Sequence, residues 1–163
     1  MSPLQPEPPP PHHSARSLAH PLGEVGVLRY RSCRRLVVIA THLYEDISAA
    51  GGLIARLAEH DVRIDVLAVT NGEGGTESAT SPHELGRRRA HRSVSYQRLG
   101  ARQVRRYELA LRSNTIADAE ADVVAALSEI LGYGPDPCAA WVLAPWQHDG
   151  HADHDAVGRA AAV

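Results

Sequence analysis

Short runs of consecutive apolar residues constrain the fold of this chain more than any other feature. The clearest is residues 36–40, where five apolar residues follow one another without interruption. A strand with one side in water alternates apolar and polar residues, whereas a strand covered on both faces is apolar throughout. Residues 62–70 and 140–144 are also strongly apolar. The pattern therefore predicts a mostly parallel sheet with helices on both of its faces.

Helical segments separate these runs along the chain. The helices that we expect are residues 46–60, 81–99, 116–131 and a last one beginning near His151, with a further, less regular strand at 104–109. The second helix has the clearest start, because Ser81 and Glu84 form a capping box and Pro82 suits the first turn. Alternating strands and helices predict an α/β fold in which right-handed crossovers connect parallel strands.

The composition predicts one ordered domain behind a disordered arm. The chain has 163 residues, of which 44% are hydrophobic, enough for the core of a single domain. Residues 1–22 are rich in proline and cannot bury much apolar area. We therefore expect an arm over residues 1–22 and a domain over residues 23–163.

Charge, hydropathy and cysteine content exclude several classes of protein. The net charge of -2 argues against a nucleic-acid-binding protein, although arginines cluster between residues 87 and 92. No apolar run is long enough to span a membrane. Cys33 and Cys138 are far apart and no signal-peptide pattern is present, so we expect a cytoplasmic protein. An oligomer is compatible with the sequence.

Two loops carry residues of the types that bind catalytic metal ions. In a parallel sheet, ligands bind beyond the carboxyl ends of the strands. His42 and Glu45 follow the strand at 36–40, and His151 and His154 follow the strand at 140–144. Two histidines and one carboxylate with an open position form a catalytic zinc site. The alternative for the second loop is a polar segment that only caps a helix, and His148 is either a further ligand or a loop residue.

The two motifs resemble those of the LmbE-like, or PIG-L, de-N-acetylases. The first motif is Thr41-His42-Leu43-Tyr44-Glu45-Asp46 followed by Gly51-Gly52, and the second is His151-Ala152-Asp153-His154. Between them, Val69-Thr70-Asn71-Gly72-Glu73 is similar to a turn of that family. The resemblance covers about residues 35–163. It implies a Rossmann-like fold. It also implies a zinc-dependent hydrolase that removes an N-acetyl group from a small molecule, an amino sugar or its conjugate.

The resemblance also implies a role for individual residues. His42, Glu45 and His154 would bind one zinc ion, and His151 would stabilise the developing oxyanion with Asp153 hydrogen-bonded behind it. Arg88 matches a substrate-contacting arginine, and the alternative is an arginine on a solvated helix face. The resemblance further implies that the chain lacks the family's C-terminal part.

The first motif departs from the family pattern where catalysis begins. Tyr44 stands where the family has the aspartate that takes a proton from the attacking water, and a neutral phenol is a poor base near neutral pH. Glu45 replaces the family's aspartate ligand and is one methylene longer. The sequence therefore leaves two alternatives, an active deacetylase in which Glu45 or Asp46 serves as base, or an inactive relative that keeps the fold and the metal.

Overall fold

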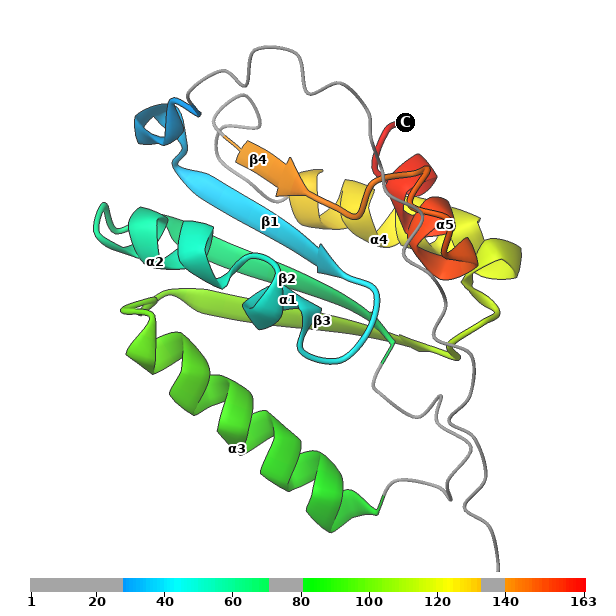
Figure 1. Ribbon diagram of the computed structural model, residues 1–163, viewed down its shortest axis with the longest axis horizontal. Helices are drawn as coiled ribbons and strands as arrows, with labels where there is room; N and C mark the ends of the chain where they lie inside the picture. Colours follow the sequence, from blue (N-terminus) through cyan, green and yellow to red (C-terminus); the bar gives the residue numbers. More distant parts are fainter. Residues whose placement is uncertain (1–27, 71–80, 133–139) are drawn as a thin grey trace, which may run out of the picture.

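The computed structural model describes residues 28–70, 81–132 and 140–163 and centres on a sheet of parallel strands (Figure 1). The strands are β1 (Arg35–Ala40), β2 (Arg63–Thr70), β3 (Val104–Leu111) and β4 (Ala140–Leu143). Their order in the sheet is β3-β2-β1-β4, and every neighbouring pair is parallel. The predicted α/β class and parallel sheet are confirmed.

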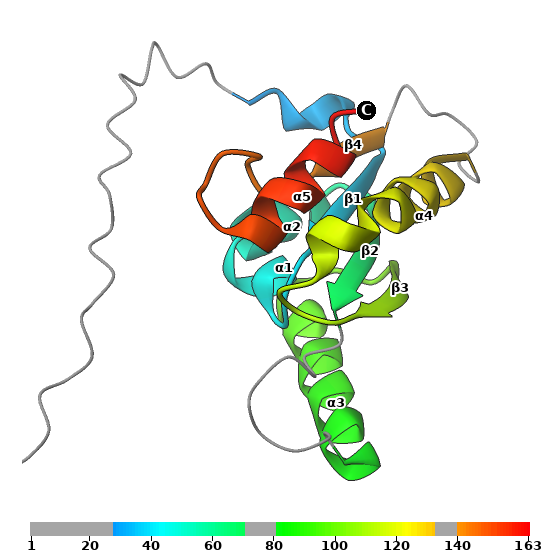
Figure 2. The same ribbon diagram turned by 90° about the vertical axis from the view of Figure 1, so that its right-hand side faces the viewer.

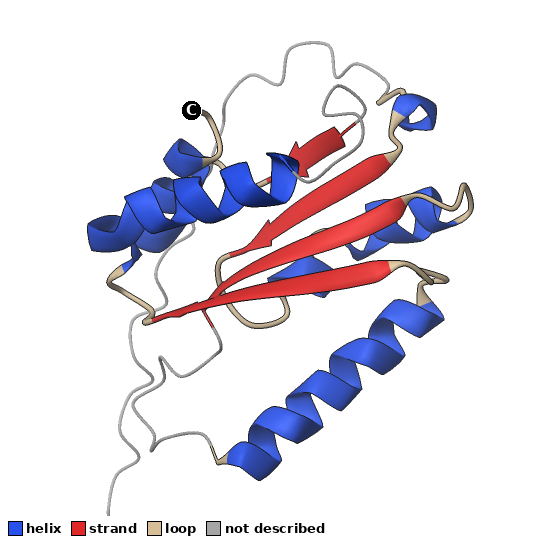
Figure 3. Ribbon diagram, turned by 180° about the vertical axis from the view of Figure 1, so that it is seen from behind, coloured by secondary structure: helices blue, strands red, loops and turns tan. Residues whose placement is uncertain are grey.

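Helices cover both faces of this sheet (Figures 1 and 3). The helical elements are η1 (Tyr30–Ser32), α1 (Glu45–Ser48), α2 (Gly51–Ala58), α3 (Pro82–Arg98), η2 (Ile116–Ala119), α4 (Glu120–Gly132) and α5 (Ala152–Ala160). Figure 3 shows α4 and α5 on one face, with α1 and α2 on the other and α3 along the β3 edge. Among the described residues, no helix is long and apolar enough to cross a membrane.

The alternation of side chains along β1 explains why both faces are covered. Leu36 and Val38 pack with Ile54 of α2 in one core, whereas Val37 and Ile39 belong to a second core beneath α4 and α5. All six residues of β1 are buried. An uninterrupted apolar run is thus what a strand between two helical layers requires.

Two predicted helices differ from those in the structure. The helix expected at 46–60 is divided into α1 and α2, because the chain leaves regular helix at Ala49 and Ala50, just before a glycine pair with poor helix propensity. A Cβ at Gly51 would make an ordinary van der Waals contact with Leu99, at 3.7 Å. The helix expected at 116–131 begins with the separate 3-10 turn η2.

A buried ion pair fixes the amino ends of the two central strands. Arg35 donates from Nε to Asp65 Oδ2 at 2.6 Å and from Nη2 to the carbonyl oxygen of Ile130 at 2.6 Å. Arg63 also pairs with Asp65, whose side chain is fully buried. This network joins β1 and β2 to the end of α4, on the opposite edge of the sheet from the two loops that carry the motifs.

The arm expected over residues 1–22 and the turn after Thr70 lie outside the described residues. Ser81 accepts a hydrogen bond from the main-chain N–H of Glu84 at 3.2 Å, so the predicted cap of α3 is confirmed.

Candidate metal centre

The carboxyl ends of β1 and β4 bring the two sequence motifs together. His42 lies in the loop between β1 and α1, and His151 and His154 lie at the start of α5; Figure 2 shows these elements. His151 is the residue that caps α5, and its Nδ1 accepts a hydrogen bond from the main-chain N–H of Asp153 at 3.3 Å. His154 follows one helical turn later, so both imidazoles face the same side of the helix.

The three imidazoles form a compact cluster. The ring centroids of His42 and His151 are 5.2 Å apart, those of His42 and His154 5.4 Å, and those of His151 and His154 4.6 Å. One nitrogen from each ring lies within 4.8 Å of the others, which is close enough to hold one metal ion. Three imidazoles that leave a position open suit zinc.

Two carboxylates hold His154 within this cluster. Glu45 Oε1 lies 2.9 Å from His154 Nε2, and Asp149 Oδ2 lies 2.5 Å from His154 Nδ1. Glu45 also accepts a hydrogen bond from the main-chain N–H of His42 at 2.9 Å through its other oxygen. A carboxylate on the far nitrogen of a metal-binding imidazole fixes the orientation of the ring and increases its basicity.

These contacts shift pKa values in opposite directions. Burial lowers the pKa of His42, despite the nearby charges of Glu45 and Asp153, and this favours the neutral imidazole that a metal needs. Burial also acts to lower the pKa of His154, but the hydrogen bonds and charges of Asp149 and Glu45 outweigh it and raise that pKa. Burial opposes ionisation of Asp149, yet its bonds to His151 and His154 lower its pKa overall.

The predicted ligand set differs in part from the cluster. His42 and His154 meet as expected, and Glu45 approaches them through His154, so its role as a ligand stays a prediction. His151, which we expected to stabilise an oxyanion, lies close enough to serve as the third nitrogen ligand. The sequence analysis did not identify Asp149 as a site residue. The feature that could have indicated it is a carboxylate five residues before His154, in the loop that precedes the helix.

Asp153 is hydrogen-bonded to His151 through its main chain, and its role as the residue that orients His151 stays a prediction. Its carboxylate is buried and accepts hydrogen bonds from the main-chain N–H groups of Asn114 at 2.6 Å and Ile116 at 3.3 Å. One of its oxygens also lies 3.7 Å from His42 Nε2. The Asp153 side chain therefore lies beside His42 and joins α5 to the segment that begins η2.

Tyr44 and Asp46, the two residues beside Glu45, have different environments. Tyr44 adopts a left-handed conformation with a φ of 70°, and its side chain is 36% exposed. Asp46 is buried and accepts hydrogen bonds from the Tyr96 hydroxyl at 2.5 Å and from Arg106 Nη1 at 3.2 Å. Burial and the adjacent carboxylate raise the pKa of Tyr96, so its hydroxyl remains a donor. Because its carboxylate is held in this way, Asp46 is a poor candidate for the catalytic base.

The remaining predicted site residues lie on α3 and in the loop before α5. Arg88 is half-buried on α3 and donates from Nε to Glu84 at 3.0 Å, and its contact with substrate stays a prediction. His148 is exposed and packs edge-on against the ring of Trp146, with centroids 5.5 Å apart. His148 is outside the cluster of three histidines.

A cavity of about 320 Å³ opens beside His154. Its lining combines Glu45, Asp149 and His154 with apolar residues from the ends of β1 and β4. Ligand pockets have this character, mostly apolar with a few convergent polar groups.

The loop that forms one side of this cavity packs tightly on α5. Gly158 lies directly beneath it, and a Cβ added there would be 2.6 Å from the main-chain nitrogen of Gln147 and 2.8 Å from the carbonyl oxygen of Pro145. Only glycine permits this approach, which keeps Asp149 within reach of His154.

Comparison with known proteins identifies the family. The model of the PIG-L family, described as GlcNAc-PI de-N-acetylase, matches residues 37–163. The chain belongs to the PIG-L family. No curated protein sequence gives a significant match.

Solved structures share the PIG-L fold of this chain. It is 24% identical to the N,N'-diacetylchitobiose deacetylase from Pyrococcus horikoshii, with a TM-score of 0.60 over 81% of this chain and 49% of that one. It is 26% identical to a conserved protein from Thermus thermophilus, with a TM-score of 0.61 over 78% of this chain and 53% of that one. The 4-carboxy-2-hydroxymuconate hydratase from Pseudomonas putida is 20% identical, with a TM-score of 0.53 over 79% and 54% of the chains. This chain therefore spans about half the length of these proteins.

Proposed function

We propose that this PIG-L protein is a zinc-dependent hydrolase that removes an N-acetyl group from a small amino-sugar-like molecule. The observation that carries the proposal is the cluster of His42, His151 and His154, whose ligand nitrogens lie within 4.8 Å of one another at the carboxyl ends of parallel strands. The family model of the de-N-acetylases, which matches most of the chain, also supports the proposal.

The donor set fits a zinc ion. Imidazole is a preferred ligand of zinc, and the lowered pKa of His42 favours its neutral, metal-binding form. Asp149 would orient the His154 ring through Nδ1. The other ring nitrogen, Nε2, which contacts Glu45, would then be available to bind the ion. A bound zinc ion would polarise the acetyl carbonyl and lower the pKa of an attacking water.

The protein's own groups would complete the chemistry. Glu45 contacts His154 Nε2 at 2.9 Å, whereas Asp149 is bound to the other nitrogen of that ring, so Glu45 would either ligate the ion or carry a proton. His151 lies at the amino end of α5, where the helix dipole favours developing negative charge. The cavity of about 320 Å³ beside His154 is large enough for an acetamido group and part of a sugar ring.

One observation favours a second candidate function, a relative that keeps the metal but has lost hydrolysis. Tyr44 occupies the position in which the family has its base, and Asp46 is held by Tyr96 and Arg106. The fold also carries other reactions, since one structural neighbour is a hydratase.

Metal analysis and a hydrolysis assay would test the proposal together. We expect about one zinc per purified chain, and His154→Ala should lose it while the circular dichroism spectrum stays unchanged. His148→Gln is the matched control, because this exposed histidine lies in the same loop but outside the cluster, and it should retain zinc. Release of acetate from N,N'-diacetylchitobiose or N-acetylglucosamine would identify an active enzyme. Full zinc without turnover would favour the inactive relative, and full zinc in His154→Ala would refute the metal site.

A further inference from the structure

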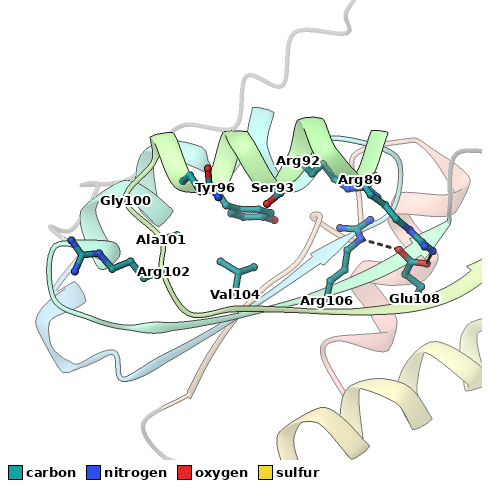
Figure 4. A pocket seen from close by; sticks show the side chains of 11 residues that line it. Arg89, Arg92, Ser93, Tyr96, Gly100, Ala101, Arg102, Val104, Arg106 and Glu108 are labelled. Carbon is teal, nitrogen blue, oxygen red and sulfur yellow. Dashed lines mark hydrogen bonds and ion pairs between the residues drawn. The ribbon is translucent and has the colours of Figure 1, made fainter. Parts of the chain in front are cut away.

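A second and larger cavity, of about 810 Å³, lies between α3 and β3 (Figure 4). None of the three clustered histidines contributes to its lining, and Glu45 does not either. One wall is the face of α3 that carries Arg89, Arg92 and Tyr96, and the other is the part of β3 that carries Arg106 and Glu108. The proposed hydrolase leaves this cavity without a role.

Arginine side chains from both walls meet at one end of the cavity. Figure 4 shows Arg89 and Arg92 reaching from the helix toward Arg106 and Glu108 on the strand. Glu108 accepts a hydrogen bond from Arg89 at 3.0 Å and lies 3.4 Å from Arg106 Nε. Arg106 also donates from Nη1 to Asp46 at 3.2 Å. Glu108 and Asp46 are thus paired with Arg89 and Arg106.

Arg92 is the third arginine at this end of the cavity. Its side chain is only 6% exposed, and it makes no hydrogen bond or ion pair within the part of the chain that the structure describes. Burial lowers its pKa, and so does the positive charge of Arg106, against the weaker opposite effect of Asp46 and Glu108. A guanidinium that is largely removed from water without a protein partner is costly, because its charge loses part of its hydration.

The cost falls when an anion from outside the protein enters the cavity. A guanidinium binds the oxygens of a phosphate or carboxylate through paired N–H donors. Arg92 and Arg106 approach one point from facing elements, so one oxyanion group could accept from both. We propose that the α3–β3 cavity binds a small organic oxyanion, either a phosphate monoester or a carboxylate, with its anionic group between Arg92 and Arg106.

The remaining lining of the cavity indicates the chemistry of the part of the ligand that carries the anionic group. Tyr96, Ala101 and Val104 provide apolar surface beyond the arginines, and Arg102 lies at the far end. A volume of about 810 Å³ is within the range of small-molecule sites and far exceeds that of an inorganic ion. The ligand is therefore an anion with an apolar or ring-shaped body. The proposal does not depend on hydrolysis at the histidine cluster.

Calorimetric titration of the purified chain with three probes would test this site. The probes are inorganic phosphate, phenyl phosphate and phenylacetate, each in chloride buffer at constant ionic strength. We expect phenyl phosphate or phenylacetate to bind more tightly than inorganic phosphate because of the apolar lining, and the tighter of the two identifies the anionic group. Arg92→Gln should weaken that binding at least about tenfold, the typical cost of losing a charge-assisted contact. Arg98→Gln is the matched control, an exposed arginine on the same helix outside the cavity, and should bind as the wild type does.

The melting temperature without ligand separates binding from a structural role. Arg92→Gln should melt at the wild-type temperature or above it, because it removes a buried charge that lacks a partner. A clear fall in melting temperature would mean that the fold needs the guanidinium, and this would overturn the proposal. Failure of the wild type to bind any of the three probes at millimolar concentration would overturn it too, as would unchanged binding by Arg92→Gln.

Discussion

Replacing Tyr44 by aspartate should raise the rate of hydrolysis without harming the fold. Tyr44 lies between His42 and Glu45 in the first motif and has a φ of 70°. A left-handed conformation costs an ordinary residue roughly 1–2 kcal/mol, whereas aspartate and asparagine adopt it more readily. The side chain is 36% exposed, so its replacement also removes some packing. We expect the two effects to offset each other within about 1 kcal/mol.

The expected gain in rate rests on the prediction that position 44 is where the proposed hydrolase needs its general base. General-base catalysis contributes about 100- to 10,000-fold, which corresponds to about 2.7–5.4 kcal/mol of barrier. A phenol at position 44 supplies little of this near neutral pH, whereas a carboxylate attached to the same main chain would supply most of it. Tyr44→Asp should therefore release acetate from N,N'-diacetylchitobiose at least about 100-fold faster than the wild type, at equal zinc content.

Tyr44→Asn separates the base from the backbone effect. Asparagine favours the same left-handed conformation but accepts no proton, so this variant should match Tyr44→Asp in melting temperature and the wild type in rate. Equal rates for the two variants at full zinc occupancy would refute the reasoning. A wild type that already turns over at ordinary enzyme rates and is slowed by Tyr44→Asp would refute it as well, because Glu45 would then be the base.

Three further substitutions test the candidate metal centre, the buried ion pair and the packing of the loop on α5. Asp149→Asn should weaken zinc binding about 10- to 100-fold in a competition titration with a chelator, because the imidazole beside it loses its orienting carboxylate. Asp65→Ala should lower the free energy of unfolding in urea by about 3–5 kcal/mol, because it leaves a buried guanidinium uncompensated. Glu59→Gln removes one partner of an exposed pair and should leave the free energy of unfolding nearly unchanged. Gly158→Ala should cost about 1–3 kcal/mol by overpacking against the loop, while Gly52→Ala, with open space around it, should gain about 0.5–1 kcal/mol in a helix.

The central strands were the most predictable part of the fold. β1 is buried on both faces, and its uninterrupted apolar run follows directly from that environment. β3 was harder to delimit, because it alternates partly buried and exposed residues at the edge of the sheet. It continues past the predicted end at residue 109 to Leu111, through Ala110 with a φ of 55° and a register shift opposite Thr70. Such an irregularity depends on pairing with β2, and local sequence does not encode it.

The site was predictable in its elements and less so in its contacts. His42 and His154 could be placed together because parallel strands end at one edge of the sheet. The positions of His151 and Asp153 depend on how α5 is capped, since the cap turns one side chain toward the cluster and the next toward Asn114. The contact of Asp149 with His154 depends on the path of a loop, which residue types and spacing do not determine.

The close packing of the loop on Gly158 has a consequence for protein engineering. The main chain at Pro145 and Gln147 leaves no space for a Cβ at this position, so every other residue type would push the loop away from α5. A library designed to change substrate preference should therefore keep position 158 constant. The positions to vary are exposed neighbours such as Trp146 and His148, where new side chains can alter the entrance of the cavity while the path of the loop is retained.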